Sequence, residues 1–118
     1  MEPIFDRNGR TVGWLHGDVI YDRSNRARAF MQGGAVYTYH GNYLGRLDRG
    51  FFRDRSGHAV AFMAGAQGGP LTPPTERPPL PPVPSRAPLP PRPALAPLAP
   101  MPSLNWSGVP WEVYLGGA

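Results

Sequence analysis

The first half of the chain repeats one unit four times without a gap. The copies begin at Pro3, Val19, Ala35 and Phe51, so the period is 16 residues, and the last copy ends at Ala66. Four copies of one period rarely arise by chance, so the fold must use one supersecondary unit four times. The period also limits functional inference, because a residue that recurs in every copy is explained by the repeat.

Each unit predicts a β-hairpin with a short strand, a turn and a longer strand. The first copy contains Asp6-Arg7-Asn8-Gly9, in which the Asp carboxylate accepts hydrogen bonds from backbone amides just ahead of it. Glycine in the last position supplies a positive φ. Asn is the non-glycine residue that enters this left-handed region most readily, so Asn25 at this position of the second copy fits the same turn. The structural turn positions are Gly9, Asn25, Gly41 and Gly57.

The longer strand alternates between a constant face and a varied one. The constant face carries a small residue followed by Leu or Met, as in Gly13 and Leu15, and we expect it to point toward a shared axis. We expect the varied face to lie outside or to be only partly covered. Its residues are Val12, Trp14 and His16; Arg28, Phe30 and Gln32; Leu44, Arg46 and Asp48; and Val60, Phe62 and Ala64.

The predicted fold class is all-β: a pseudo-four-fold closed ring, or shallow barrel, of four β-hairpins with eight antiparallel strands. An open antiparallel meander is the alternative. Closure is favoured because it removes exposed strand edges, and because no copy has the atypical sequence of a capping repeat.

The sequence divides into three parts: the repeats over residues 1–66, a Pro-rich linker over 67–103, and an aromatic segment over 104–118. Residues 70–103 contain 15 prolines. Such a stretch forms neither a helix nor a central strand. We expect an extended polyproline II spacer with a reach on the order of 100 Å. The run from Leu80 to Arg86 also matches peptides that dock in SH3-type grooves, with a plain spacer as the alternative.

The end of the chain predicts a docking tail formed by Trp106, Trp111, Tyr114 and Leu115. Pro110 suits the start of a helix, and a short helical segment would place Trp111 and Leu115 on one face. Large aromatic side chains are typical anchors in interfaces. We therefore expect this segment to bury its aromatic face reversibly on its own ring, on a second copy or on another protein.

The chain resembles the bacterial proteins that carry a four-fold β-flower domain. The resemblance is carried by the four turns, by the Pro-rich spacer and by the closing element from Trp106 to Leu115. It implies a shallow pseudo-four-fold barrel with hairpin petals, and it implies no enzymatic activity. A likeness of such domains to tubby-like barrels suggests lipid binding. The third repeat departs from the pattern, with Thr38 and Tyr39 in the turn and Arg46 in place of a large apolar residue.

Little in the sequence indicates chemistry, so we predict no catalytic residue, no cofactor and no metal. The chain has no cysteine, which excludes disulfides and Cys-based zinc sites. His16, His40 and His58 occupy different positions of the repeat, so the symmetry does not bring them together. A carboxylate ring for a cation is an alternative reading of the turn aspartates Asp6, Asp22 and Asp54.

The basic residues are all arginines, 12 in number, and the net charge is +4. A candidate anion-binding rim at the hairpin turns consists of Arg7, Arg10, Arg23, Arg26 and Arg55. The sequence therefore predicts a non-enzymatic binding or assembly module, cytoplasmic, whose partner is itself or another protein. The alternative is peripheral binding of anionic membrane lipid through the arginine rim. Nucleic acid is not expected, because few aromatic residues alternate with the arginines.

Overall fold

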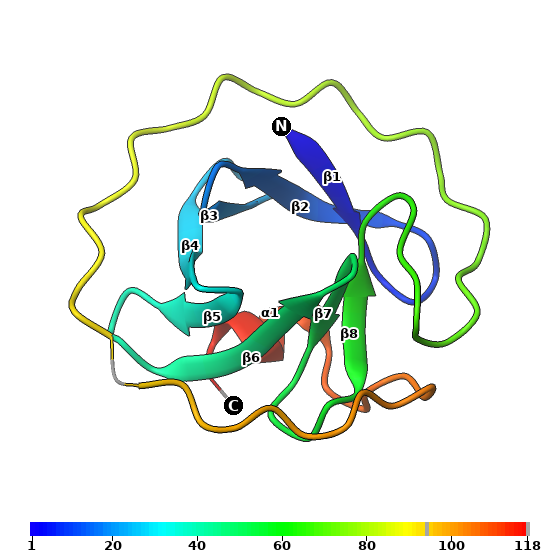
Figure 1. The fold of residues 1–118 in the computed structure, drawn as a ribbon. Coiled ribbons are helices and arrows are strands. Elements are labelled where there is room, and N and C mark those ends of the chain that lie inside the picture. The colour runs from blue at the N-terminus through cyan, green and yellow to red at the C-terminus, as the bar shows by residue number, and fades with distance from the viewer. Residues whose placement is uncertain (94, 118) are drawn as a thin grey trace.

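The structure, a computed structural model, describes residues 1–93 and 95–117. Eight strands follow one another around a closed barrel, each antiparallel to the next (Figure 1). The predicted ring of four hairpins and the short C-terminal helix are thus confirmed, and the open meander is wrong. The elements are β1 (Glu2–Phe5), β2 (Thr11–His16), β3 (Val19–Asp22), β4 (Ala27–Gln32), β5 (Ala35–Thr38), β6 (Tyr43–Asp48), β7 (Phe51–Arg53), β8 (Ala59–Phe62) and α1 (Trp111–Leu115).

The interior of the barrel is formed by the face that the repeat keeps constant. Small residues such as Ala29 and Ala61 are fully buried there, and Leu or Met side chains pack beside them. Each short strand adds one large apolar side chain to the same cluster. These are Ile4, Ile20, Val36 and Phe52. The close approach of neighbouring strands explains the small residues, because a Cβ on Gly45 would lie 1.8 Å from the carbonyl oxygen of Arg53.

Each hairpin contains a β-bulge at the same position of its longer strand. In the first hairpin Ile4 pairs with Gly13 and Phe5 with Thr11, which leaves Val12 without a partner. A bulge adds one residue to one strand and increases the local twist. The four bulge residues are Val12, Arg28, Leu44 and Val60. Leu44 and Val60 are buried in the interior cluster, so the prediction that this face lies outside or is only partly covered is wrong for them, whereas Val12 is partly buried against the same cluster.

The varied face is also more buried than predicted. Trp14, Phe30 and Phe62 are each less than 5% exposed. Ala96 packs against the cluster that contains Phe30, and Trp106 packs against Phe62. The reason for the error is that later parts of the chain cover this face, which the repeats alone do not reveal.

The Pro-rich segment runs around the outside of the barrel in an extended conformation (Figure 1). We call residues 70–93 and 95–103 the belt. Hydrogen bonds fasten it to the first, second and fourth hairpin turns, with Glu76 N donating to Gly9 O, Ser85 Oγ donating to Asn25 O and Ser103 N donating to Gly57 O. The whole molecule measures 35 × 35 × 21 Å. The extended conformation agrees with the prediction, and the length of the segment is used to follow the circumference of its own barrel.

Candidate functional site

One end of the barrel is covered by α1, which is visible behind the ring in Figure 1. Trp111, Tyr114 and Leu115 are buried within the same cluster as the barrel interior. The Trp111 ring meets Phe52 edge-on with 5.3 Å between ring centroids, and it stacks on Tyr114 at 5.6 Å. The predicted docking residues of the helix are therefore placed in the core of the barrel.

Two polar contacts orient α1 on the barrel. The Tyr114 hydroxyl donates to the carbonyl oxygen of Arg53 at 3.0 Å, and burial raises the pKa of this phenol far above its ordinary value. Glu112 forms an ion pair with Arg28, with 3.0 Å between Oε2 and Nη1. Arg28 is the polar bulge residue, so the second hairpin supplies the charge that matches the acidic residue in the first turn of the helix.

Trp106 lies at a different place from the helix. It is partly buried against Phe51 and Phe62, with 6.2 and 6.0 Å between the ring centroids. Its neighbour Ser107 donates a backbone hydrogen bond to Ala59 and a side-chain hydrogen bond to Asp54. Trp106 thus holds the segment to the edge of β8, whereas Trp111 fills the end of the barrel.

The four structural turn positions all have positive φ. The angles are 79°, 61°, 86° and 86° for Gly9, Asn25, Gly41 and Gly57. Asp6, Asp22 and Asp54 accept two backbone hydrogen bonds each within these turns, and Thr38 Oγ1 takes this role in the third copy. The aspartates are therefore occupied by turn amides. Among the residues that the structure describes, no three His, Cys, Asp or Glu side chains group as metal ligands would.

The five rim arginines are exposed but differ in their contacts. Arg23 donates to the carbonyl oxygen of Thr11, and Arg26 pairs with Asp22 at 3.2 Å. Arg7, Arg10 and Arg55 make no side-chain hydrogen bond or ion pair with the described part of the chain. These three are thus available to an external anion.

Asp22 connects this rim to the helix. It accepts hydrogen bonds from the Arg26 and Ser24 amides and forms an ion pair with Arg28 at 3.1 Å. Burial opposes ionisation of Asp22, but these hydrogen bonds outweigh it and the pKa of the carboxyl is lowered. Asp22 therefore remains charged and positions Arg28 for Glu112.

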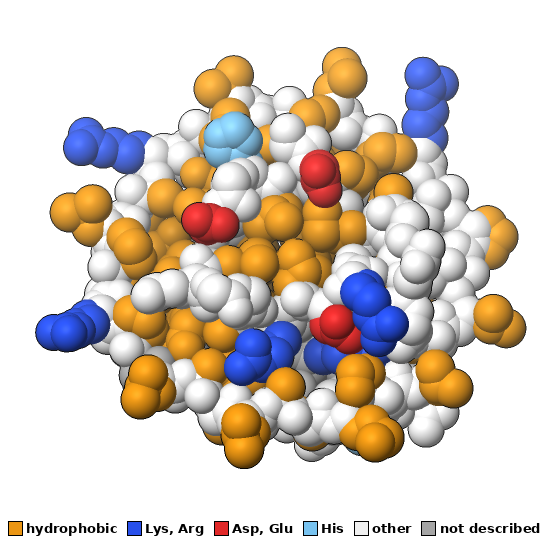
Figure 2. Space-filling model, in the orientation of Figure 1, with side chains coloured by type: hydrophobic (Ala, Val, Ile, Leu, Met, Phe, Trp, Pro, Cys, Tyr) orange, Lys and Arg blue, Asp and Glu red, His pale blue; other side chains and the backbone are white. Residues whose placement is uncertain are grey.

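The outer edge of the belt carries a row of large side chains, which we call the outer row. Prolines keep the belt extended, and a polyproline II helix has three residues per turn, so every third residue shares one edge. All members of the row are exposed. Apolar side chains and arginine side chains both project around the circumference of the molecule in Figure 2. They are Leu71, Pro74, Arg77, Leu80, Val83, Arg86, Leu89, Arg92, Leu95, Leu98, Met101 and Leu104.

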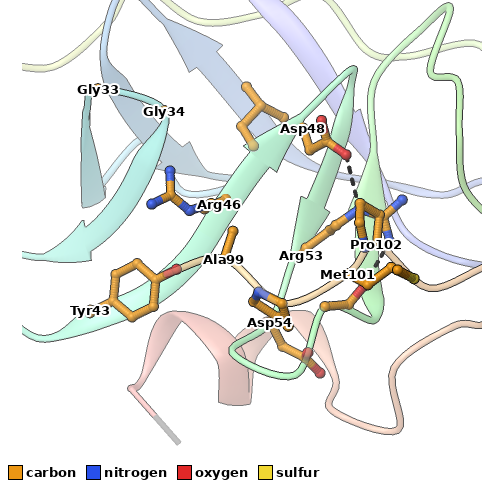
Figure 3. Close-up of a pocket in the computed structure, with 13 residues that line it drawn as sticks. Gly33, Gly34, Tyr43, Arg46, Asp48, Arg53, Asp54, Ala99, Met101 and Pro102 are labelled. Atoms are coloured by element: carbon orange, nitrogen blue, oxygen red, sulfur yellow. Dashed lines mark hydrogen bonds and ion pairs between the residues drawn. The ribbon is translucent and has the colours of Figure 1, made fainter. Parts of the chain in front are cut away.

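A cavity of about 730 Å³ lies between the belt and the hairpins formed by β5–β6 and β7–β8. Its walls come from the β4–β5 turn, from β6, from β7 and from belt residues 99–102. In Figure 3 the guanidinium of Arg46 lies on one side, and the Asp48–Arg53 ion pair lies on the other. Burial lowers the pKa of Arg53, although Asp48 acts in the opposite sense.

Sequence reasoning missed both the outer row and the role of Arg53. The row has a sequence signal, a three-residue period of large side chains from residue 71 to residue 104. Arg53 also has a sequence signal, because it is an arginine at a position where the other copies carry the aromatic residues Phe5, Tyr21 and Tyr37. The sequence shows the departure at Arg46, but nothing in the repeats indicates that a cavity opens beside it.

Residues 2–115 match the family model described as "4-fold beta flower protein". Neither the curated proteins nor the solved structures include a significant match to the chain. The family match spans the barrel, the belt and α1, so all three parts belong to one family architecture.

Proposed function

Since this chain belongs to the 4-fold β-flower family, which is described by its fold and not by a reaction, we propose that it is a non-enzymatic binding module. Its ring is closed by its own C-terminal segment, and its belt presents the outer row to a partner protein. The observation that carries the proposal is the outer row itself. Large side chains along one edge of a preformed polyproline II helix are what Pro-recognising grooves bind.

Docking of the C-terminal segment in cis is favoured by how completely it is buried. Trp111, Tyr114 and Leu115 are each at most 5% exposed against their own barrel. A segment in this position has no free aromatic face for a second copy. Hydrogen exchange of the amides from Trp111 to Leu115 should therefore show equal protection at low and high protein concentration. Protection only at high concentration would indicate docking in trans.

The chemistry of the outer row suggests what kind of partner fits it. The row combines aliphatic side chains with Arg77, Arg86 and Arg92, and it contains no acidic residue. Glu76, the only acid between residues 70 and 104, faces the barrel and accepts a hydrogen bond from Thr11 N. A groove lined by aromatic residues and edged by carboxylates complements such a row, as in domains that recognise polyproline II helices.

The attachment of the belt also favours this partner. Asn25 donates from its side-chain amide to Val83 O and accepts from Ser85 N, which holds the run from Leu80 to Arg86 in place. Leu80 and Val83 nevertheless remain 93% and 86% exposed. A peptide held in its bound conformation loses less entropy on binding than a free one.

The test is calorimetric titration of the full-length chain with a panel of purified SH3-type domains that have acidic groove edges. We expect saturable binding by at least one domain, and we expect Arg86→Glu to abolish it. Arg7→Glu is the matched control, because it makes the same charge change on an exposed turn outside the belt. Absence of binding by the whole panel, or equal binding by Arg86→Glu, would contradict the proposal.

A second candidate function is peripheral binding of anionic lipid. It is favoured by Arg7, Arg10 and Arg55, which are exposed and unpaired within the described residues. No helix among those residues is both long and apolar enough to cross a bilayer. Flotation with phosphatidylserine-containing vesicles should depend on these arginines and fall with salt. Equal flotation with pure phosphatidylcholine vesicles would rule this function out.

A further inference from the structure

The cavity lies where the four-fold pattern of the outer barrel face is broken. At three of the four junctions between hairpins, two aromatic residues pair across neighbouring strands. These pairs are Trp14 with Tyr21, Phe30 with Tyr37, and Phe5 with Phe62. At the fourth junction Arg46 pairs with Arg53. Like charges directly opposite one another destabilise a sheet, so this pair needs a compensating interaction.

Arg53 obtains its compensation from within the chain. Its side chain is 4% exposed, and Nη1 donates to the carbonyl oxygens of Gly57 and Ser103 at 2.7 and 2.8 Å. Nη2 donates to Gly68 O at 2.8 Å, and Nε lies 3.5 Å from Asp48 Oδ2. Arg53 therefore connects the approach to the belt at Gly68 with its end at Ser103, and its Nε makes no hydrogen bond with a described atom but lies at ion-pair distance from Asp48.

Arg46 is much less satisfied. It makes one long hydrogen bond, 3.3 Å from Nη2 to Pro97 O, and forms no ion pair with any described residue. Its Nε is buried and lacks a hydrogen-bond partner among the described atoms. The burial of Nε closes it to a ligand, so the terminal nitrogens of the guanidinium are the atoms that a bound anion would reach.

The acidic residues of the cavity wall do not neutralise Arg46. Asp48 is engaged by Arg53 and by Arg49, the latter at 3.4 Å. Asp54 accepts from two turn amides and from Ser107 Oγ at 2.6 Å. The cavity thus combines one uncompensated guanidinium with apolar walls from Tyr43, Leu47 and belt residues 99–102.

We propose that this cavity binds a small organic anion. Arg46 receives its carboxylate, sulfonate or phosphate group, and Tyr43, Leu47 and the belt contact its apolar body. A volume of about 730 Å³ exceeds the needs of an inorganic ion and falls within the range of small-molecule sites. Guanidinium groups bind such anions through charge-assisted hydrogen bonds. This site is independent of the outer row and of the partner proposed for it.

The test uses 8-anilinonaphthalene-1-sulfonate, a fluorescent aromatic sulfonate, as the probe. N-phenyl-1-naphthylamine has the same rings without the sulfonate and is the matched control ligand. We expect saturable binding of the sulfonate by the full-length chain, and much weaker binding of the neutral compound. Arg46→Gln should weaken sulfonate binding by about tenfold to a hundredfold, as expected for loss of a charge-assisted hydrogen bond. Equal affinity of the two compounds would overturn the proposal.

Two further variants separate the site from general effects. Arg77→Gln removes an exposed arginine of the belt, outside the cavity and outside the arginine rim, and should leave sulfonate binding unchanged. Arg46→Phe restores the residue type of the other hairpins and should remove sulfonate binding while the cooperative unfolding transition is retained. Should either Arg46 variant fail to fold, NMR titration of the wild-type chain decides, because the probe must shift the amides of Gly33, Gly34 and Met101. Unchanged binding by folded Arg46→Gln, or shifts confined to other regions, would refute the site.

Discussion

The closing contact between belt and barrel can be measured with one pair of matched substitutions, Gly57→Ala and Gly41→Ala. Both glycines have φ of 86° and occupy the same position of the hairpin turn. A Cβ at position 57 would lie 2.8 Å from the carbonyl oxygen of Met101 in the belt, whereas nothing lies within 4 Å of a Cβ at position 41. The difference between the two variants therefore reports the belt, because the backbone strain is common to both.

The expected magnitudes follow from these contacts. The left-handed conformation costs a non-glycine residue roughly 1–2 kcal/mol, and we expect this loss of stability in Gly41→Ala. In Gly57→Ala the belt must also move away, which weakens the hydrogen bond from Ser103 N to Gly57 O and the one that Arg53 Nη1 donates to Ser103 O. At about 0.5–1.5 kcal/mol for each bond, the additional loss is on the order of 1–3 kcal/mol.

The assay is equilibrium unfolding in urea, followed by far-ultraviolet circular dichroism. The midpoint gives the change in the free energy of unfolding, provided that the slope is unchanged. Gly57→Ala should unfold at a clearly lower urea concentration than Gly41→Ala. Equal midpoints would refute the reasoning, because they would mean that the belt does not lie against this turn in solution.

Three further predictions concern the helix α1, the ion pairs of Asp22 and the start of the belt. Trp111→Ala should lower the free energy of unfolding by about 3–5 kcal/mol, since it empties a buried site, while Val113→Ala on the 44% exposed side should change it by less than about 0.5 kcal/mol; similar melting temperatures by calorimetry would contradict the placement of α1. The lowered pKa of Asp22 means that its carboxylate stabilises the fold above the ordinary carboxyl pKa of 3.8, and that this stability is lost as the pH falls through the lowered value. Acid titration should therefore destabilise the wild type more steeply than Asp22→Asn, and parallel curves would argue against these ion pairs. Gly69→Val should be destabilising although position 69 reads as linker, because a Cβ would lie 2.7 Å from the Phe51 ring; a thermal melt equal to that of Gly108→Val, where nothing lies within 4 Å, would count against it.

Much of the barrel could be predicted because its determinants are local. The hydrogen bonds within each turn join residues two to four positions apart, and Asp6, Asp22, Thr38 and Asp54 repeat them at one position of the unit. Positive φ at Gly9 or Asn25 is likewise a property of a single residue and its type. In the longer strands, a small residue and a Leu or Met are two positions apart. Residues two positions apart lie on the same face of a strand, so this face could be assigned to the barrel axis from the sequence.

The C-terminal helix was also predictable in outline, but its position was not. The size and the spacing of Trp111 and Tyr114 predict that their side chains are buried, and both are. That they fill the end of the barrel depends on the bulges, which add Val12, Leu44 and Val60 to the cluster that also holds the residues of α1, and which offer Arg28 to Glu112. A bulge is set by the pairing of two strands, so one strand read alone does not reveal it.

By itself, the sequence determined four hairpins, their turns, their inward face and an extended Pro-rich segment. Only the tertiary structure decided that this segment encircles the barrel, that Arg53 connects its two ends and that a cavity opens beside Arg46. The physical reason is the separation of the groups involved. Asn25 meets Ser85, and Arg53 meets Ser103, across 60 and 50 residues, and contacts at such separation follow from the closed shape of the barrel and not from any local pattern.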